Sequence, residues 1–544
     1  MTHRLLFAVV LCLGFGSASC TVTSRAGDTG TGGGNVDGNV DTGVRPTIDA
    51  WRDHGPGTVL IASDAPPDAP MHFDGTPDPM NAPELVYPDD GVMIPPNLET
   101  FELHFRPNGS TLFRMDLSIS TGDVHVYFVC SEPVGGGCIY TPDHDTWAAI
   151  QMATRGRSGV TWSVTGTDSM GRVGTSPTRS IQVANEDITG GVYYWNAAAG
   201  SIMRYEFGVP GAVEETYLRG ASAFNCIGCH ALSRDGSHIA VGRGIPTSTV
   251  QVYDVASRMM QYQNFRDTSG TMVPGRPDFF SFNPDGTQLV MSNPMGLNIA
   301  DATGAITATH ITTGVSTMPD WSPDGQHIVY VSVAGGPAIE APGVTSGSLA
   351  RIDLVGGTWT AGPVLADAGG ANNYHPTYAP DGQWIVFNHS PSNANSFGDD
   401  TSSSSNGSCV TDGELWAVAS DGSSAPFHMT NVGGVCSSWP KFDPTTYQDH
   451  GHDLFWVAWA TARGYGLRYG DGSIMQIWMA AFDPTLASSG TPTHAPFRLP
   501  FQNIATGNHI AQWVTSVQRM ACTTDADCPG EFCYMRRCYN QQPI

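Results

Sequence analysis

Four Asp-Gly turns recur between residues 233 and 382, each between two short apolar strands. The turns are SRDG at 233–236, NPDG at 283–286, SPDG at 322–325 and APDG at 379–382, and the strands after them are HIAVG, QLVMS, HIVYV and WIVFN. Glycine accepts the positive φ that a tight hairpin turn needs. Degenerate copies follow at 441–446 (KFDPTT, before LFWVAWA) and at 508–517 (NHIAQWVTSV, without the turn). The pattern predicts six antiparallel hairpins.

Further strand pairs lie between these hairpins, and the pair VYYWNAAAGSIMRYEF at 192–207 precedes the first of them. Four strands repeated about every fifty residues are typical of propeller blades. The sequence therefore predicts a six-bladed β-propeller over residues 187–520, with both ends of that region sharing one blade. Closing the ring in this way removes the exposed strand edges.

The hairpins resemble those of TolB and of the wider WD-like repeat propellers, and the resemblance covers roughly residues 190–520. It implies a TolB-like six-bladed propeller. Propellers of this kind serve as scaffolds, as binding proteins and as platforms for enzymes, so the fold alone does not assign a function.

Alternating apolar and polar positions also occur before the propeller, for example FELHF at 101–105, VHVYFVC at 124–130 and VTWSVTGTD at 160–168. Strands of this length bounded by Gly, Pro or Asp predict an immunoglobulin- or fibronectin-like β-sandwich over residues 81–186. Residues 21–80 are rich in Gly, Thr, Asp and Pro, with hardly any apolar spacing, and predict a disordered tether. The expected fold class is all-β.

The first twenty residues have the features of an export signal. Arg4 is followed by an apolar run from Leu5 to Phe15, and small residues at 17–19 precede Cys20. This arrangement resembles the lipobox of bacterial lipoproteins, although a serine stands where leucine is usual. We expect residues 1–20 to be a lipoprotein-type signal peptide and Cys20 to be acylated; the alternative is ordinary cleavage with Cys20 incidental. Thr21 after the cysteine favours the outer membrane, by analogy with sorting in enteric bacteria.

Charge and composition narrow the classes of function. The chain has 50 Asp and Glu against 25 Lys and Arg, a formal net charge of −25, which argues against nucleic acid as a partner. Lys441 is its only lysine, so no Walker loop is present. We also find no G-x-S-x-G elbow and no HExxH motif, so catalysis is not indicated.

The cysteines outside the signal peptide fall into local groups, as expected for an oxidising compartment. We predict disulfides within each group and a disulfide-rich tail over residues 521–544. The groups are Cys130 with Cys138, Cys409 with Cys436, and Cys522, Cys528, Cys533 and Cys538 in the tail.

The motif CIGCH at 226–230 matches the attachment pattern for c-type haem. Cys226 and Cys229 would form thioethers with the porphyrin, and His230 would bind the iron. Aligned on the Asp-Gly turns, Cys229 and His230 fall where other blades have Phe279-Phe280, Met318-Pro319, His375-Pro376 and Trp439-Pro440, so the repeat itself does not require the motif. The alternatives are a small disulfide followed by an incidental histidine, and a metal site.

The register places His230 near the mouth of the central channel. A second axial ligand would be His375, Met318 or His509, and we favour His375 because its blade lies opposite that of His230. A polar residue lining the channel is the competing interpretation of His375.

Together these features predict an exported, lipid-anchored protein of the cell envelope. We expect its propeller to carry one covalent haem c for electron transfer or redox-linked binding, and to meet an envelope protein or redox partner through the propeller face. The alternative is a haem-free scaffold or binding lipoprotein that holds a protein or a glycan. A haem-dependent enzyme is a third, weaker option.

Overall fold

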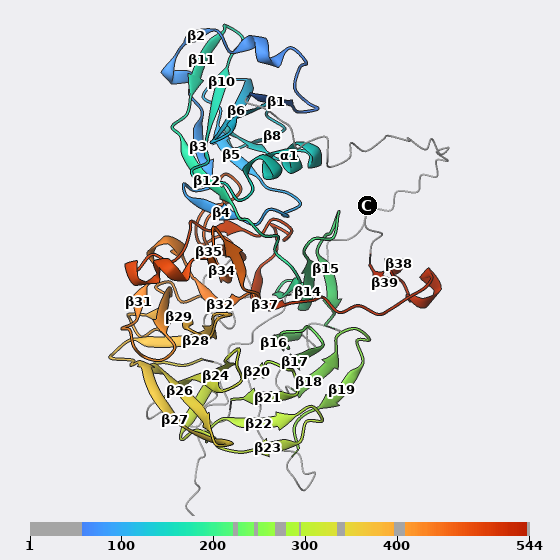
Figure 1. The fold of residues 1–544 in the computed structure, drawn as a ribbon, viewed down its shortest axis with the longest axis vertical. Coiled ribbons are helices and arrows are strands. Elements are labelled where there is room, and N and C mark those ends of the chain that lie inside the picture. The colour runs from blue at the N-terminus through green and yellow to red at the C-terminus, as the bar shows by residue number, and fades with distance from the viewer. Residues whose placement is uncertain are drawn as a thin grey trace, which may run out of the picture.

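A computed structural model describes residues 57–220, 227–243, 249–266, 279–292, 295–333, 343–396 and 409–540. Its strands form two bodies, a β-sandwich followed by a β-propeller, stacked along the long axis of the molecule (Figure 1). The fold is all-β as predicted, and its one α-helix among the described residues is α1 (His144–Thr154). The expected signal peptide with Cys20, and also Cys226, lie outside the described residues.

The propeller has six blades around a closed ring, each a meander of antiparallel strands. The second blade is β16 (Ile227–Leu232), β17 (His238–Arg243), β18 (Thr249–Asp254) and β19 (Met260–Gln263); the third is β20 (Phe280–Phe282), β21 (Gln288–Met291), β22 (Asn298–Asp301) and β23 (Ile306–Ala308). The fourth is β24 (Val315–Trp321), β25 (His327–Val333), β26 (Gly347–Val355) and β27 (Thr358–Ala366); the fifth is β28 (Asn372–Tyr378), β29 (Trp384–Ser390), β30 (Glu414–Ala419) and β31 (Phe427–His428). The sixth is β32 (Ser438–Phe442), β34 (His452–Thr461), β35 (Gln476–Phe482) and β36 (Phe497–Arg498), with β33 (Tyr447–Asp449) added to β34.

Both ends of the propeller region meet in the first blade. Its innermost strand is β37 (Asn508–Val514), which pairs with β13 (Gly191–Asn196), and β14 (Ser201–Glu206) and β15 (Glu215–Leu218) complete the sheet. The shared blade is as predicted, and residues 192–207 form its second and third strands. Because the last repeat lacks its turn, it contributes one strand only.

The Asp-Gly turns adopt the geometry that the sequence indicates. In SPDG, Gly325 has a φ of 74°, and the carboxylate of Asp324 accepts hydrogen bonds from the hydroxyl of Ser322 (2.5 Å) and the backbone N–H of Gln326 (2.9 Å). Asp therefore fixes the turn while Gly supplies the left-handed residue.

The sandwich consists of an eight-stranded and a four-stranded sheet. The first contains β1 (Thr58–Ile61), β2 (Thr76–Pro77), β4 (Val92–Ile94), β6 (Leu112–Ile119), β7 (Gly122–Val129), β10 (Thr161–Thr167), β11 (Arg172–Thr175) and β12 (Arg179–Val183). The second contains β3 (Glu84–Tyr87), β5 (Leu103–Arg106), β8 (Glu132–Val134) and β9 (Gly137–Tyr140). Phe105 from the smaller sheet packs edge-on against Phe113 from the larger (4.8 Å between ring centres), so apolar side chains from both sheets form the core.

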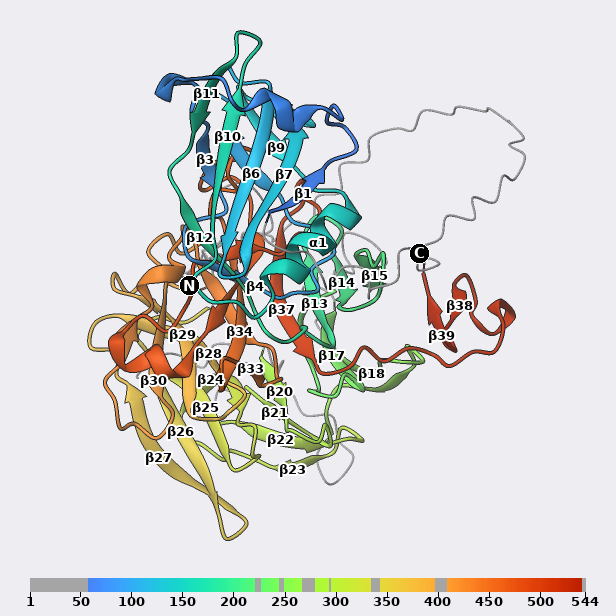
Figure 2. The same cartoon turned by 45° about the horizontal axis from the view of Figure 1, so that its top comes forward.

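Two features of this body differ from the sequence prediction. Strand β1 pairs in parallel with β7, so residues 58–61 belong to the sandwich, although the sequence predicted a tether over residues 21–80. The four-residue apolar run of β1 was too short to be recognised. Helix α1 was not predicted either. Asp143 caps it by accepting from the N–H of Thr146 (2.8 Å), and Trp147 and Ile150 are buried on one face. Figure 2 shows α1 at the end of the sandwich nearer the propeller.

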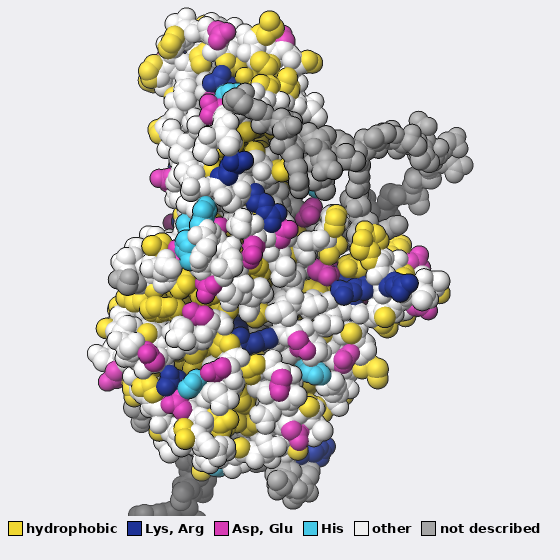
Figure 3. All heavy atoms as spheres, viewed as in Figure 1, with side chains coloured by type: hydrophobic (Ala, Val, Ile, Leu, Met, Phe, Trp, Pro, Cys, Tyr) yellow, Lys and Arg dark blue, Asp and Glu magenta, His cyan; other side chains and the backbone are white. Residues whose placement is uncertain are grey.

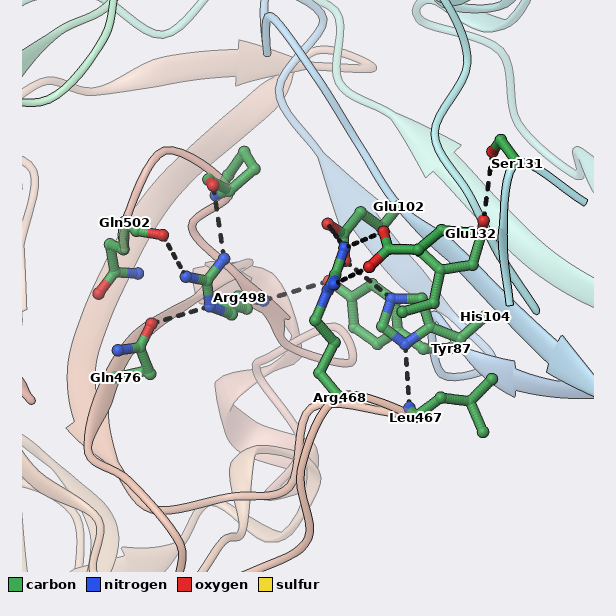
Figure 4. A network of polar contacts seen from close by, with 12 residues as sticks. Tyr87, Glu102, His104, Ser131, Glu132, Leu467, Arg468, Gln476, Arg498 and Gln502 are labelled. Atoms are coloured by element: carbon green, nitrogen blue, oxygen red, sulfur yellow. Dashed lines mark hydrogen bonds and ion pairs between the residues drawn. The ribbon is translucent and has the colours of Figure 1, made fainter. Parts of the chain in front are cut away.

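The two bodies share one hydrophobic core and a polar network between blade six and the small sheet (Figure 4). Arg468 pairs with Glu102 and Glu132, at 2.7 Å in each case, and the N–H of Leu467 donates to Nδ1 of the buried His104 (3.1 Å). Burial alone would raise the pKa of Glu102, but hydrogen bonds from His104 and Arg468 lower it. The sandwich is thus fixed to the propeller by packing and by paired charges.

Four disulfides close the cysteine groups locally, as the spacing predicted. They are Cys130–Cys138, Cys409–Cys436, Cys522–Cys533 and Cys528–Cys538. The last two hold the tail hairpin of β38 (Phe532–Tyr534) and β39 (Arg537–Tyr539) beside the first blade (Figure 1). Arg519 anchors this tail, because it pairs with Glu206 (2.7 Å) and Glu215 and lies over the ring of Tyr539.

Candidate functional site

Five of the six innermost strands of the propeller contain a β-bulge at the same place in the repeat. In β24, residues 318–319 together oppose the single residue Tyr330, and residues 375–376 and 439–440 are arranged in the same way. The second bulge residue is proline in all three blades; proline has no N–H for the ladder, and a bulge tolerates it. The first bulge residue has positive φ in four blades: Met318 (49°), His375 (48°), Trp439 (53°) and Ile510 (55°).

Side chains from these bulges fill one side of the channel. The imidazole of His375 stacks on Trp439 (3.9 Å between ring centres), and Phe279 from blade three lies 5.5 Å from Trp439 in the opposite blade. The N–H of His375 also donates to the sulfur of Met318 (3.4 Å). We call Phe279, Met318, His375 and Trp439 the aromatic plug, because they meet across the channel and leave a cavity of about 70 Å³ beside them.

A buried carboxylate beneath the plug connects several blades. Asp320 in β24 accepts from Nζ of Lys441 in blade six (2.5 Å), from the hydroxyl of Ser281 in blade three (3.2 Å) and from the N–H of Tyr378 in blade five (2.8 Å). Arg234, in the turn of blade two, donates to the carbonyl of Trp321 (3.0 Å). Sequence reasoning missed this hub; the signal was a single lysine in a repeat whose other copies have none.

The CIGCH motif occupies the corresponding bulge of blade two. Gly228 pairs with Gly242 and His230 with Val241, so Cys229 is the extra residue of β16. His230 is 3% exposed and lines the channel cavity, as its repeat position predicted. The motif therefore starts a β-strand at the channel, whereas Cys226 lies outside the described residues.

The imidazole of His230 has the protonation state and the unpaired ring nitrogen that a metal ligand needs. One ring nitrogen, Nε2, lies 3.5 Å from the carbonyl of Tyr193, and Nδ1 has no hydrogen-bond partner among the described residues. Burial lowers the pKa of His230 to about 4, so the ring is neutral at pH 7. Metal-binding histidines commonly hold a backbone carbonyl with one nitrogen and the metal with the other. The donor chemistry of His230 thus fits an iron ligand.

The three residues considered as second axial ligand lie in different surroundings. Met318 and His375 are part of the aromatic plug, and the blade of His375 lies opposite that of His230, as the repeat order predicted. His509 is in β37, in the blade next to the motif; it is 1% exposed, and its Nε2 has no partner in the described structure. Burial lowers the pKa of His509 to about 4. His509 therefore has a buried ring nitrogen without a hydrogen-bond partner among the described residues, and it lies outside the aromatic plug.

Other buried polar atoms without partners gather near His509. Both side-chain atoms of Asn508 and the indole N–H of Trp195 have no hydrogen-bond partner within the described residues, and the ring of Trp195 lies 5.7 Å from that of His509. Buried polar groups in folded proteins are normally paired. We call His230, His509, Asn508 and Trp195 the motif side of the channel.

The channel cavity limits where a haem could lie. Pockets for organic ligands typically enclose about 300–1,000 Å³, and the cavity next to His230 encloses about 70 Å³. A cavity of this size does not enclose a porphyrin, so a haem held by His230 would extend beyond it. The fit to haem rests on the donor chemistry of His230 and on the motif.

The surface and the secondary structure add two observations. On the face shown in Figure 3, Lys and Arg side chains lie scattered among Asp and Glu side chains. Within the part of the chain that the structure describes, no helix is both long and apolar enough to cross a bilayer.

Comparison with known proteins gives structural likenesses only. The chain is similar to the structure of putative TolB from Agrobacterium tumefaciens (16% identity, TM-score 0.35, covering 61% of this chain and 93% of that chain). It is also similar to TolB from Acinetobacter baumannii (15% identity, TM-score 0.38, covering 85% of this chain and 97% of that chain). No family model and no curated protein matches the chain. The propeller assignment accordingly rests on the sheet topology described above.

Proposed function

We propose that this chain is an exported envelope propeller that carries one covalent c-type haem at Cys226, Cys229 and His230. The haem would serve electron transfer or redox-linked binding. The observation that carries the proposal is the state of His230, which directly follows C-x-x-C and is buried, neutral and without a partner at one ring nitrogen.

Each residue of the motif has a defined part in this proposal. The thiols of Cys226 and Cys229 would attach the porphyrin, and His230 would bind the iron with one nitrogen while the carbonyl of Tyr193 orients the other. A bound haem supplies one-electron chemistry. His509 is the preferred second ligand, because His375 and Met318 are held in the aromatic plug.

The location in the envelope is part of the same proposal. The apolar run before Cys20 supports export and acylation of Cys20, and Thr21 supports anchoring in the outer membrane. Haem attachment through thioethers takes place outside the cytoplasm, so the signal and the motif support each other. An envelope redox partner would then approach the propeller face.

A pyridine haemochrome spectrum tests the proposal. The full chain is produced alongside a c-type maturation system, and we expect a c-type spectrum and haem staining on a denaturing gel. The double variant Cys226→Ser/Cys229→Ser should lose both signals. The matched control Cys130→Ser/Cys138→Ser removes another local cysteine pair and should keep them. A colourless wild-type protein contradicts the proposal.

A haem-free binding propeller is the second candidate. It is favoured by the aromatic plug, which reduces the channel cavity to about 70 Å³ and leaves the propeller face as the main surface for a protein or glycan. A colourless protein in which peptide mapping finds a Cys226–Cys229 disulfide would support this candidate.

A further inference from the structure

The channel cavity contains the only lysine of the chain. Lys441 lines it, and its side chain is about one quarter exposed, so the ammonium group reaches the cavity from blade six. Nζ donates one hydrogen bond, to Asp320 (2.5 Å). An ammonium group has three N–H donors, so Lys441 retains donors for a ligand in the cavity.

Other groups around the cavity add to this excess of donors. The indole N–H of Trp439 is buried and has no acceptor in the described structure. The amide of Gln512 in β37 lies in the cavity wall. An indole N–H can only donate, and buried donors without acceptors are costly. The lining is therefore complementary to a molecule rich in acceptors.

The charges nearby also favour an anion. Two cations interact with the buried carboxylate of Asp320: Lys441, which lines the cavity, and Arg234, in the turn of blade two. Asp324 also attracts Arg234, but its side chain is 59% exposed, so solvent screens it. Arg234, Lys441 and Asp320 together thus carry one excess positive charge in a chain whose formal net charge is −25.

The size of the cavity restricts the ligand. One water needs about 10–15 Å³ of such volume, and the cavity offers about 70 Å³. This is room for roughly five water-sized positions, which suits a molecule of about four to six heavy atoms. Trp439 and Phe279 provide an apolar wall for a short carbon chain.

We propose that the channel cavity is a binding site for a small monocarboxylate, with Lys441 as the charge partner and Gln512 as a further donor. Acetate and lactate represent the class. The site does not depend on haem, since it uses residues of the inner strands that the structure describes. It would make the propeller a sensor or carrier of short organic acids.

Ligand-observed NMR with the full chain tests this site. Sodium acetate is titrated at constant ionic strength against acetamide, its neutral counterpart of the same shape. We expect saturable acetate binding in the millimolar range and at least tenfold weaker binding of acetamide. Equal binding of the two, or no acetate binding up to about 100 mM, would overturn the proposal.

Three variants locate the binding. Lys441→Met should weaken acetate binding at least tenfold, and Gln512→Leu, which leaves the ion pair with Asp320 intact, should weaken it about threefold to tenfold. Arg106→Met removes an exposed charge on the sandwich and should leave it unchanged. If Lys441→Met does not fold, Gln512→Leu decides. Wild-type affinity in a folded Lys441→Met or in Gln512→Leu refutes the site, whatever the haem content.

Discussion

On blades four to six, the bulge of the innermost strand carries a residue followed by proline, whereas blades one and two carry Ile510-Ala511 and Cys229-His230 there. The β-bulge itself is common to these five blades. The bulges of blades four to six contribute Met318, His375 and Trp439 to the aromatic plug, in which side chains contact one another across the channel. On the motif side, buried polar atoms of His230, His509, Asn508 and Trp195 lack partners among the described residues, as does the indole N–H of Trp439 in the plug. The repeat thus fixes the backbone of the bulge, whereas its side chains differ between the two sides of the channel. On one side they form the aromatic plug, and on the other they include His230 of the CIGCH motif.

Breaking the hub beneath the plug should have the largest effect on stability. Asp320→Ala leaves Lys441 without its buried partner, and removing one member of a buried ion pair costs about 3–5 kcal/mol. Urea unfolding of wild type and variant measures the loss in the free energy of unfolding. The double variant Asp320→Asn/Lys441→Met removes both charges and should recover most of it. A loss below about 1 kcal/mol in Asp320→Ala would contradict the hub.

Acidification should have the next largest effect on stability, through the motif side of the channel. The pKa of His509 is about 4 in the folded protein against about 6.5 unfolded, so the unfolded chain binds its proton first. The stabilising contribution is therefore complete above pH 6.5 and is lost as the pH falls from 6.5 to 4, by up to about 3 kcal/mol. Urea midpoints of wild type and His509→Leu, compared at pH 7.5 and 4.5, measure it. A difference between the two proteins that does not change with pH excludes this titration.

At neutral pH, His509→Leu should have a smaller effect on stability. Its sign should be opposite to that of most core substitutions, which destabilise the protein. In the haem-free protein, His509→Leu replaces a buried nitrogen without a partner by an apolar group, so stability should stay constant or rise by about 1 kcal/mol. Trp439→Ala on the plug side should instead cost about 3 kcal/mol. Thermal unfolding of both variants compares the two sides. Equal losses would show that the motif side is packed for stability too.

Much of the fold could be predicted because its determinants are local. Each Asp-Gly turn fixes one hairpin, and the repeat of these turns gave the number of blades, their order and the position of His230. The start of the sandwich could not be predicted, since β1 is a four-residue strand whose partner, β7, follows sixty residues later. Helix α1 has a capping residue and buried residues at helical spacing, but this spacing was overlooked in a sequence dominated by strand patterns.

The candidate site was predictable only in part. The motif and the repeat alignment placed His230 at the channel, but the favoured second ligand, His375, stacks on Trp439. That stacking joins blades five and six, and the ion pair between Lys441 and Asp320 joins blades six and four. Contacts between residues so distant in sequence follow from the ring geometry, which strand patterns do not contain. His509 emerged because its ring nitrogen is buried without a partner.

The closing strand of the ring also sets an order in time. Chains are made from the N-terminus, and β13 is synthesised more than three hundred residues before its partner β37. Until Asn508–Val514 emerges, blade one is one strand short and β13 presents an open edge able to pair with another chain. The ring is completed only when almost the entire polypeptide has been made, so a growing or truncated chain depends on protection that the finished protein no longer needs.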